Sequence, residues 1–185
     1  RILNDWAPVF VDIINRLTDI QKNQNFLPYL SFEQLPTALY INNSSDKNNW
    51  GESCSNHAIS HMLNKLLLNV KNIFSNELSH LTLSTAKINE IYDKEHLDHF
   101  CLCNSLLANQ INKSDHIIIN GKSLLRSTEP SALILLTIAC VAKTLYNKQV
   151  YIINLSINAN LHQQHPVPPI VYQQLFKALD GVSTQ

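Results

Sequence analysis

This sequence lacks an excess of basic charge, because its 14 lysine and arginine residues are balanced by 14 aspartate and glutamate residues. A chain without a basic stripe has little to neutralise a phosphate backbone, so nucleic acid is not expected as a partner. Charged residues make up only 15% of the chain, but hydrophobic residues make up 45%, which argues against disorder. With 185 residues, the chain is long enough to bury the core of one domain, or of one lobe of a two-lobed protein.

Long apolar runs and paired cysteines are also lacking. The longest apolar run, residues 132–142, is far shorter than the roughly 20 residues that cross a bilayer, and it predicts a buried helix instead. Cys54, Cys101, Cys103 and Cys140 contain no CxxC pair, so we expect free thiols and no disulfide framework. These features together predict a cytoplasmic protein with no transmembrane segment.

Three motifs of well-defined chemistry are missing. Gly121, Lys122 and Ser123 resemble the end of a phosphate loop, but that loop would need glycine where His116 stands. No glutamate lies between His57 and His61, as a zinc hydrolase of the HExxH type requires. A GxSxG elbow is absent too, which leaves an esterase-type triad unsupported.

What the sequence does contain is an alternation of helical and extended patterns. Apolar residues at three- and four-residue spacing between residues 2 and 20 predict an amphipathic helix in an amino-terminal extension, residues 1–34. A strand is predicted over residues 37–42, and a long helix follows Trp50. The apolar face of that helix is predicted to contain Ile59, Met62, Leu63, Leu66 and Val70.

The same alternation continues to the end of the chain. The strands predicted there are residues 81–83, 100–103, 116–120 and 149–157, with another beginning at Val182. The helices predicted there are residues 86–92, 106–111, 130–146 and 171–179, with a proline connector at 166–169. The pattern predicts an α/β fold over residues 35–185, with a Rossmann-like parallel sheet and helices on both faces.

In such a sheet, ligands bind at the carboxyl ends of the strands. The loops that follow the predicted central strands are residues 42–52, 120–128 and 158–169. The first of them ends in Trp50, Gly51 and Glu52 at a helix start, where free N–H groups favour an anion. A carboxylate at Glu52 fits an ordinary helix cap equally well.

Two groups of histidine and cysteine are candidate metal ligands. Cys54, His57 and His61 share one stripe of the predicted helix, but solvent-exposed or hydrogen-bonded histidines are the favoured interpretation. A denser group has its cysteines on one face of a predicted strand but matches no regular zinc spacing; its members are His96, Asp98, His99, Cys101 and Cys103. We therefore expect no metal and no cofactor, and a metal-dependent enzyme using the denser group remains the weakest alternative.

Four segments, taken in order, resemble the polysaccharide pyruvyl transferase superfamily. Asn49-Trp50-Gly51-Glu52 resembles the family's N-[WR]-G-D-x-A-I helix start, and residues 112–121 resemble its A-D-[LV]-[IV]-[IV]-x-G-G-G strand. Residues 142–157 are similar to the family's A-K-x-x-G-K-P-V strand entry and S-I-G-P turn, and residues 180–183 to the segment before its next strand. This chain departs from the pattern in having Glu for Asp at position 52, one glycine at 121, and no Gly-Pro after residue 157.

The resemblance implies the amino-terminal lobe of a GT-B-like enzyme of glycan biosynthesis. Members of this family transfer the enolpyruvyl group of phosphoenolpyruvate to a sugar hydroxyl. One wall of the implied cleft comprises Asn49, Trp50, Gly51 and Glu52, with Glu52 as a base toward the sugar. The opposite wall comprises Gly121, Lys122, Ser123 and Arg126, where Lys122 or Arg126 meets anionic charge.

The resemblance leaves the activity itself open. The alternative is a degenerate, noncatalytic lobe that serves as an interaction or scaffold module, with the helix at residues 2–20 as its docking element. Because the chain begins at Arg1 and carries no terminal signal, we expect a processed product or a fragment. A second lobe or a homo-oligomer would then complete it.

Overall fold

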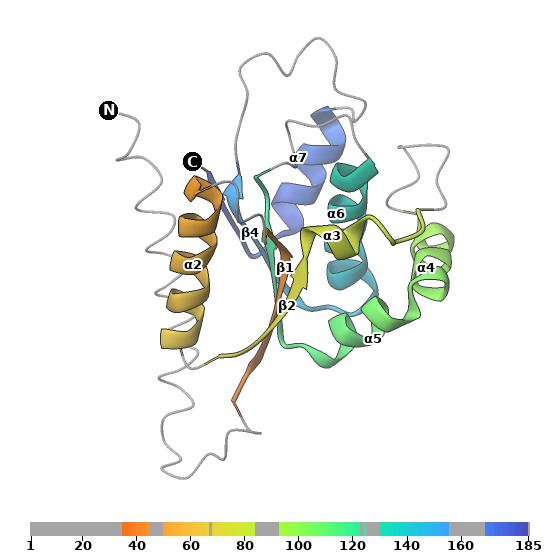
Figure 1. Ribbon diagram of the computed structural model, residues 1–185. Helices are drawn as coiled ribbons and strands as arrows, with labels where there is room; N and C mark the ends of the chain where they lie inside the picture. Colours follow the sequence, from red (N-terminus) through yellow and green to blue (C-terminus); the bar gives the residue numbers. More distant parts are fainter. Residues whose placement is uncertain are drawn as a thin grey trace.

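The computed structural model describes residues 35–44, 50–66, 68–83, 93–122, 124, 130–155 and 169–184. Strands and helices alternate through these ranges (Figure 1). The strands are β1 (Thr37–Asn43), β2 (Asn69–Phe74), β3 (His116–Asn120), β4 (Gln149–Leu155) and β5 (Gly181–Thr184). The helices are α2 (Trp50–Lys65), α3 (Ser75–Leu78), α4 (Lys94–Cys103), α5 (Ser105–Lys113), α6 (Pro130–Cys140), the π-helix η4 (Val141–Leu145) and α7 (Pro169–Ala178).

The five strands form one sheet in the order β2-β1-β3-β4-β5, and every neighbouring pair is parallel. The central strand β3 is buried along its whole length, which suits its run of three isoleucines because helices cover both faces of such a sheet. The predicted α/β fold with a Rossmann-like parallel sheet is confirmed.

Two apolar layers lie on opposite faces of the sheet. Figure 1 shows α2 on one side and α4, α5, α6 and α7 on the other. The side chains of β1 point alternately into the two layers. Ala38 and Tyr40 belong to the cluster on the α2 face, and Leu39 and Ile41 belong to the larger cluster on the opposite face. The helices thus cover both faces, as predicted.

Strand β2 was not predicted, and Val70 was wrongly assigned to the preceding helix. In the structure α2 ends at Lys65, and Val70 pairs with Ala38 of β1. Only Ile73 of this edge strand is buried, so β2 has neither the apolar run nor the alternation that predicts a strand.

The strands predicted at residues 81–83 and 100–103 are also wrong. Residues 100–103 end α4, because Leu97 and Phe100 lie one helical turn apart and both enter the core. Residues 81–83 form no strand, and the backbone N–H and C=O of Thr82 both pair with the Asn104 side chain instead. Thr82 N–H donates to Asn104 Oδ1 at 2.9 Å, and Asn104 Nδ2 donates to Thr82 O at 2.9 Å.

The other predicted elements within the described ranges are confirmed. The strand at 37–42 is β1, the helix at 106–111 lies within α5, and the last helix and strand are α7 and β5. The helix predicted over 130–146 is present as α6 followed by one π-helical turn. The predicted helices at 2–20 and 86–92 and most of the proline connector lie outside the described residues. Within these ranges, no helix is both long and apolar enough to cross a membrane.

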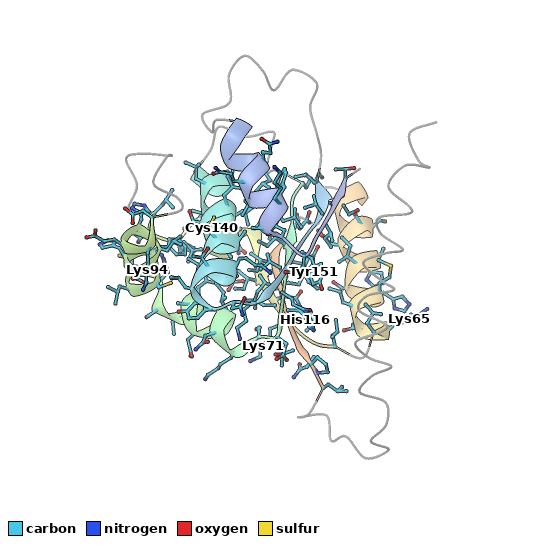
Figure 2. All side chains as sticks on the ribbon, turned by 180° about the vertical axis from the view of Figure 1, so that it is seen from behind. Lys65, Lys71, Lys94, His116, Cys140 and Tyr151 are labelled. Carbon is cyan, nitrogen blue, oxygen red and sulfur yellow. The ribbon has the colours of Figure 1, made fainter. Side chains whose placement is uncertain are left out.

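His116 is a buried histidine at the start of β3. Its side chain is 4% exposed, its Nδ1 has no hydrogen-bond partner among the described residues, and its ring lies 6.4 Å from that of Tyr151 (Figure 2). Burial lowers the pKa of His116, while Asp115, Gln149 and Asp180 act in the opposite direction. The fold therefore favours the neutral imidazole.

We expect the protein to lose stability as the pH falls through the ordinary histidine pKa of about 6.5. Because the folded-state pKa lies below the unfolded-state value, the unfolded chain binds more protons in this window, and acid favours unfolding. Denaturant unfolding between about pH 7.5 and 5.5 checks this, with His116→Gln as the variant and the exposed His61→Gln as its control. A wild-type slope matching that of His116→Gln would contradict the prediction.

Candidate functional site

The candidate site lies at the carboxyl ends of β1 and β3. From β1 the chain passes to β2 on one side, whereas β3, β4 and β5 follow on the other side, so the strand order reverses between β1 and β3. Ligands of open α/β sheets bind at this kind of switch point. Helix α2 also begins at this edge, since it follows β1 in the chain.

Asparagines lie at or one residue before the carboxyl ends of three adjacent strands at this edge. Asn42 lies in β1, Asn120 in β3 and Asn154 in β4. Asn42 has a φ of 66° and Asn154 a φ of 60°, in the left-handed region that asparagine tolerates better than most residues. Each lies at a shift of pairing register, between Ile41 and Asn43 in β1 and between Ile152 and Leu155 in β4. The strands on either side of β3 are therefore bulged where their ends meet the site.

Asn120 connects these strand ends. Its Oδ1 accepts from Asn154 Nδ2 at 3.0 Å and from the backbone N–H of Lys122 at 3.2 Å. Its backbone carbonyl accepts from Asn42 Nδ2 at 2.8 Å, and its own Nδ2 donates to Asn56 Oδ1 at 3.1 Å. The side chain is only 3% exposed, so these bonds form in a largely dry environment that strengthens them.

Asn56 brings α2 into the same network. Its Oδ1 accepts a second bond from the Tyr40 hydroxyl at 3.0 Å, and its Nδ2 donates to Ser44 O at 3.0 Å. Burial raises the pKa of Tyr40 well above its ordinary value, although a hydrogen bond with Asn120 opposes the rise. The phenol therefore stays protonated and remains a donor to Asn56.

The network is neutral. Its amide donors and acceptors come from Asn42, Asn56, Asn120 and Asn154. Among the residues that the structure describes, Lys122 is the charged residue next to the end of β3, and its backbone N–H joins the network. The hydrogen bonds of these amides run between the strands and to α2, and they hold the strand ends in place.

Gly121 follows Asn120 directly, and its position leaves no room for a side chain. A Cβ here would lie 2.7 Å from Ile152 Cγ2 and 3.1 Å from Leu155 Cδ1, both on β4. Its N–H donates to Ile153 O at 2.8 Å. Close packing against β4 thus explains the glycine without a ligand.

The residues predicted for the site fall into three groups. Gly121 and Lys122 lie at the carboxyl end of β3, as expected. Trp50, Gly51 and Glu52 form the first turn of α2, but their side chains are not among those described. The remaining three, Asn49, Ser123 and Arg126, lie outside the described residues.

The asparagine network itself was not predicted. The sequence shows each asparagine at the end of an apolar strand, which is the one signal that identifies them as site residues. Which of them meet depends on the strand order, because Asn42 and Asn120 lie 78 positions apart in the chain.

The two histidine and cysteine groups do not form metal sites in the part of the chain described here, where no cluster of three ligand residues is close enough to hold an ion. Cys54, His57 and His61 are exposed on α2. His99 and Cys103 lie on consecutive turns of α4, so the strand face assumed for the two cysteines is wrong.

Comparisons with protein-family models, with curated proteins and with solved structures gave no significant match.

Proposed function

We propose that this chain is one lobe of a polysaccharide pyruvyl transferase-like enzyme, with its cleft at the carboxyl ends of β1 and β3. One observation carries the proposal. Trp50, Gly51 and Glu52 of one family-like segment begin α2, and a second family-like segment, residues 112–121, contains β3. Helix α2 meets the end of β3, because Asn120 Nδ2 donates to Asn56 Oδ1 at 3.1 Å. Segments far apart in the chain thus converge at the switch point where ligands bind.

In the proposed reaction, a sugar hydroxyl adds to the enolpyruvyl group of phosphoenolpyruvate. In this proposal Glu52 accepts the hydroxyl proton, and Asn49, Trp50 and Gly51 belong to the same wall of the cleft. On the other wall, Lys122 and Arg126 offset the negative charge of the donor beside Gly121 and Ser123. A second lobe or a second copy of the chain closes the cleft, and the enzyme acts in the cytoplasm.

Titration of the full-length protein with phosphoenolpyruvate tests this proposal. A ligand that binds only the folded state stabilises it by about 2.7 kcal/mol at a hundredfold excess over its Kd, so the melting temperature should rise and saturate. Lys122→Ala should weaken the shift. Lys65→Ala should retain it, because Lys65 ends α2 at the opposite edge (Figure 2).

A noncatalytic α/β module is the second candidate, and a specific observation favours it. The side-chain amides of Asn56 and Asn120 are bonded to their neighbours rather than left open to a ligand, and packing alone explains Gly121. No thermal shift at roughly millimolar phosphoenolpyruvate would favour this module over the transferase.

A further inference from the structure

The four cysteines differ sharply in their surroundings. Cys140 is buried in α6, and burial raises its pKa to about 12. Cys101 is half-buried, and burial raises its pKa as well, although a hydrogen bond with Tyr146 opposes the rise. Only Cys54 and Cys103 are exposed. The thiolate is the reactive form of cysteine, and a reagent must also reach the sulfur. Thiol reagents in solution should therefore react first with Cys54 and Cys103.

Cys103 alone of these two has a base beside it. Its Sγ lies 3.6 Å from His99 Nδ1, one helical turn earlier on α4, and both side chains are exposed. Cys54 also has histidines close in sequence, His57 and His61, but no hydrogen bond joins it to either of them in the described structure. Cys54 and Cys103 are thus both exposed thiols, and they differ in that Cys103 contacts an imidazole.

The surface around Cys103 leaves the thiol open to reagents. Cys103 is itself exposed, and its neighbours Leu102 and Leu106 are 78% and 81% exposed, which is unusual for leucine. Leu97 and Phe100 anchor the inner face of α4 in the core, so the outer face is held in a fixed orientation. The pair is therefore preformed on a stable helix.

We propose that Cys103 is a modification site for low-molecular-weight disulfides, with His99 as its proton acceptor. The thiol proton passes to His99 Nδ1 as the sulfur attacks one sulfur of the disulfide. The disulfide bond breaks, a mixed disulfide forms at Cys103, and the departing thiolate takes the proton from His99. The disulfide is the oxidant, and one free thiol is released for each cysteine modified.

Glutathione disulfide at about pH 7 is the probe, and mass spectrometry of digested samples measures the rate at each cysteine. Cys103 should react about tenfold faster than Cys54, less than the roughly hundredfold gain of a positioned base in an enzyme, since water surrounds both groups. Equal rates at the two cysteines would overturn the proposal.

The variant His99→Gln tests whether the imidazole, rather than solvent exposure alone, makes Cys103 react faster. This variant should lower the rate at Cys103 to that of Cys54 while the rate at Cys54 stays unchanged, which also shows that the fold is intact. His61→Gln is the matched control and should alter neither rate. A Cys103 rate that persists in His99→Gln would remove His99 from the proposal and overturn it.

Discussion

Asn120→Asp should destabilise the protein by about 3 kcal/mol at neutral pH, a large loss for a change of one atom. The amide Nδ2 that donates to Asn56 Oδ1 becomes an oxygen, so two acceptors face each other across 3.1 Å. The new carboxylate is also buried, because the position is only 3% exposed. Bonds from Asn154 and Lys122 to the other oxygen offset part of this cost.

Denaturant unfolding of Asn120→Asp beside the wild type, at about pH 7.5 and about pH 5.5, measures the loss. Burial and repulsion raise the folded-state pKa of the new carboxyl group, so the loss is greatest at high pH and shrinks as acid protonates it. A protonated oxygen can again donate to Asn56. Asn109→Asp on the exposed face of α5 is the control, and an equal loss there would contradict the role of the network.

The central strands could be predicted because burial on both faces makes their sequence apolar. Residues Ile117, Ile118 and Ile119 have this property, and so does most of β4. Strand β2 lacks it, since among the described strands it pairs with β1 alone, and it exposes most of its side chains. Its existence depends on a partner strand, which local periodicity does not register.

Helix α4 shows the reverse error. The end of this helix, residues 100–103, is an apolar run that resembles a strand, yet Leu102 and Cys103 are exposed. The helix is stabilised at its start by the N-cap Asp93, whose side chain accepts a hydrogen bond from Glu95 N at 3.2 Å. It is stabilised further by the burial of Leu97 and Phe100. Tertiary packing outweighs the local pattern here.

The edge of the sheet that holds the candidate site could be expected from the sequence, but the contacts there could not. Strand ends are binding positions in parallel sheets, and the residues expected after β3, Gly121 and Lys122, do lie at the carboxyl end of that strand. That Asn120 meets Asn42 and Asn154 follows from the strand order, and both neighbours also need a left-handed backbone. Neither property is visible in a sequence where each asparagine follows an ordinary apolar strand.

Gly121→Val should also be strongly destabilising, by about 3 kcal/mol, because it overpacks a filled core. The backbone there does not have a positive φ, so the cost comes from space alone. The first new atom would lie 2.7 Å from Ile152 Cγ2, a methyl group close to the buried β4 backbone that cannot swing away. Gly121→Ala should cost about half as much, since it adds only that atom.

A double-mutant cycle identifies the clash. Ile152→Ala removes the obstructing methyl group, so Gly121→Ala combined with Ile152→Ala should cost about 1 kcal/mol less than the sum of the single changes. Leu63→Ala lies in the cluster on the α2 face and should add to Gly121→Ala without coupling. Coupling of the same size with Leu63 would contradict a local clash.

The same double variant distinguishes the two explanations of this glycine. Ile152→Ala removes the closest atom that a Cβ at position 121 would meet, so the thermal shift of the double variant is compared with that of Ile152→Ala alone. If phosphoenolpyruvate stabilises Ile152→Ala but not the double variant, the glycine also admits the ligand to the backbone of β3. If it stabilises both equally, close packing against β4 is the whole reason that residue 121 is glycine.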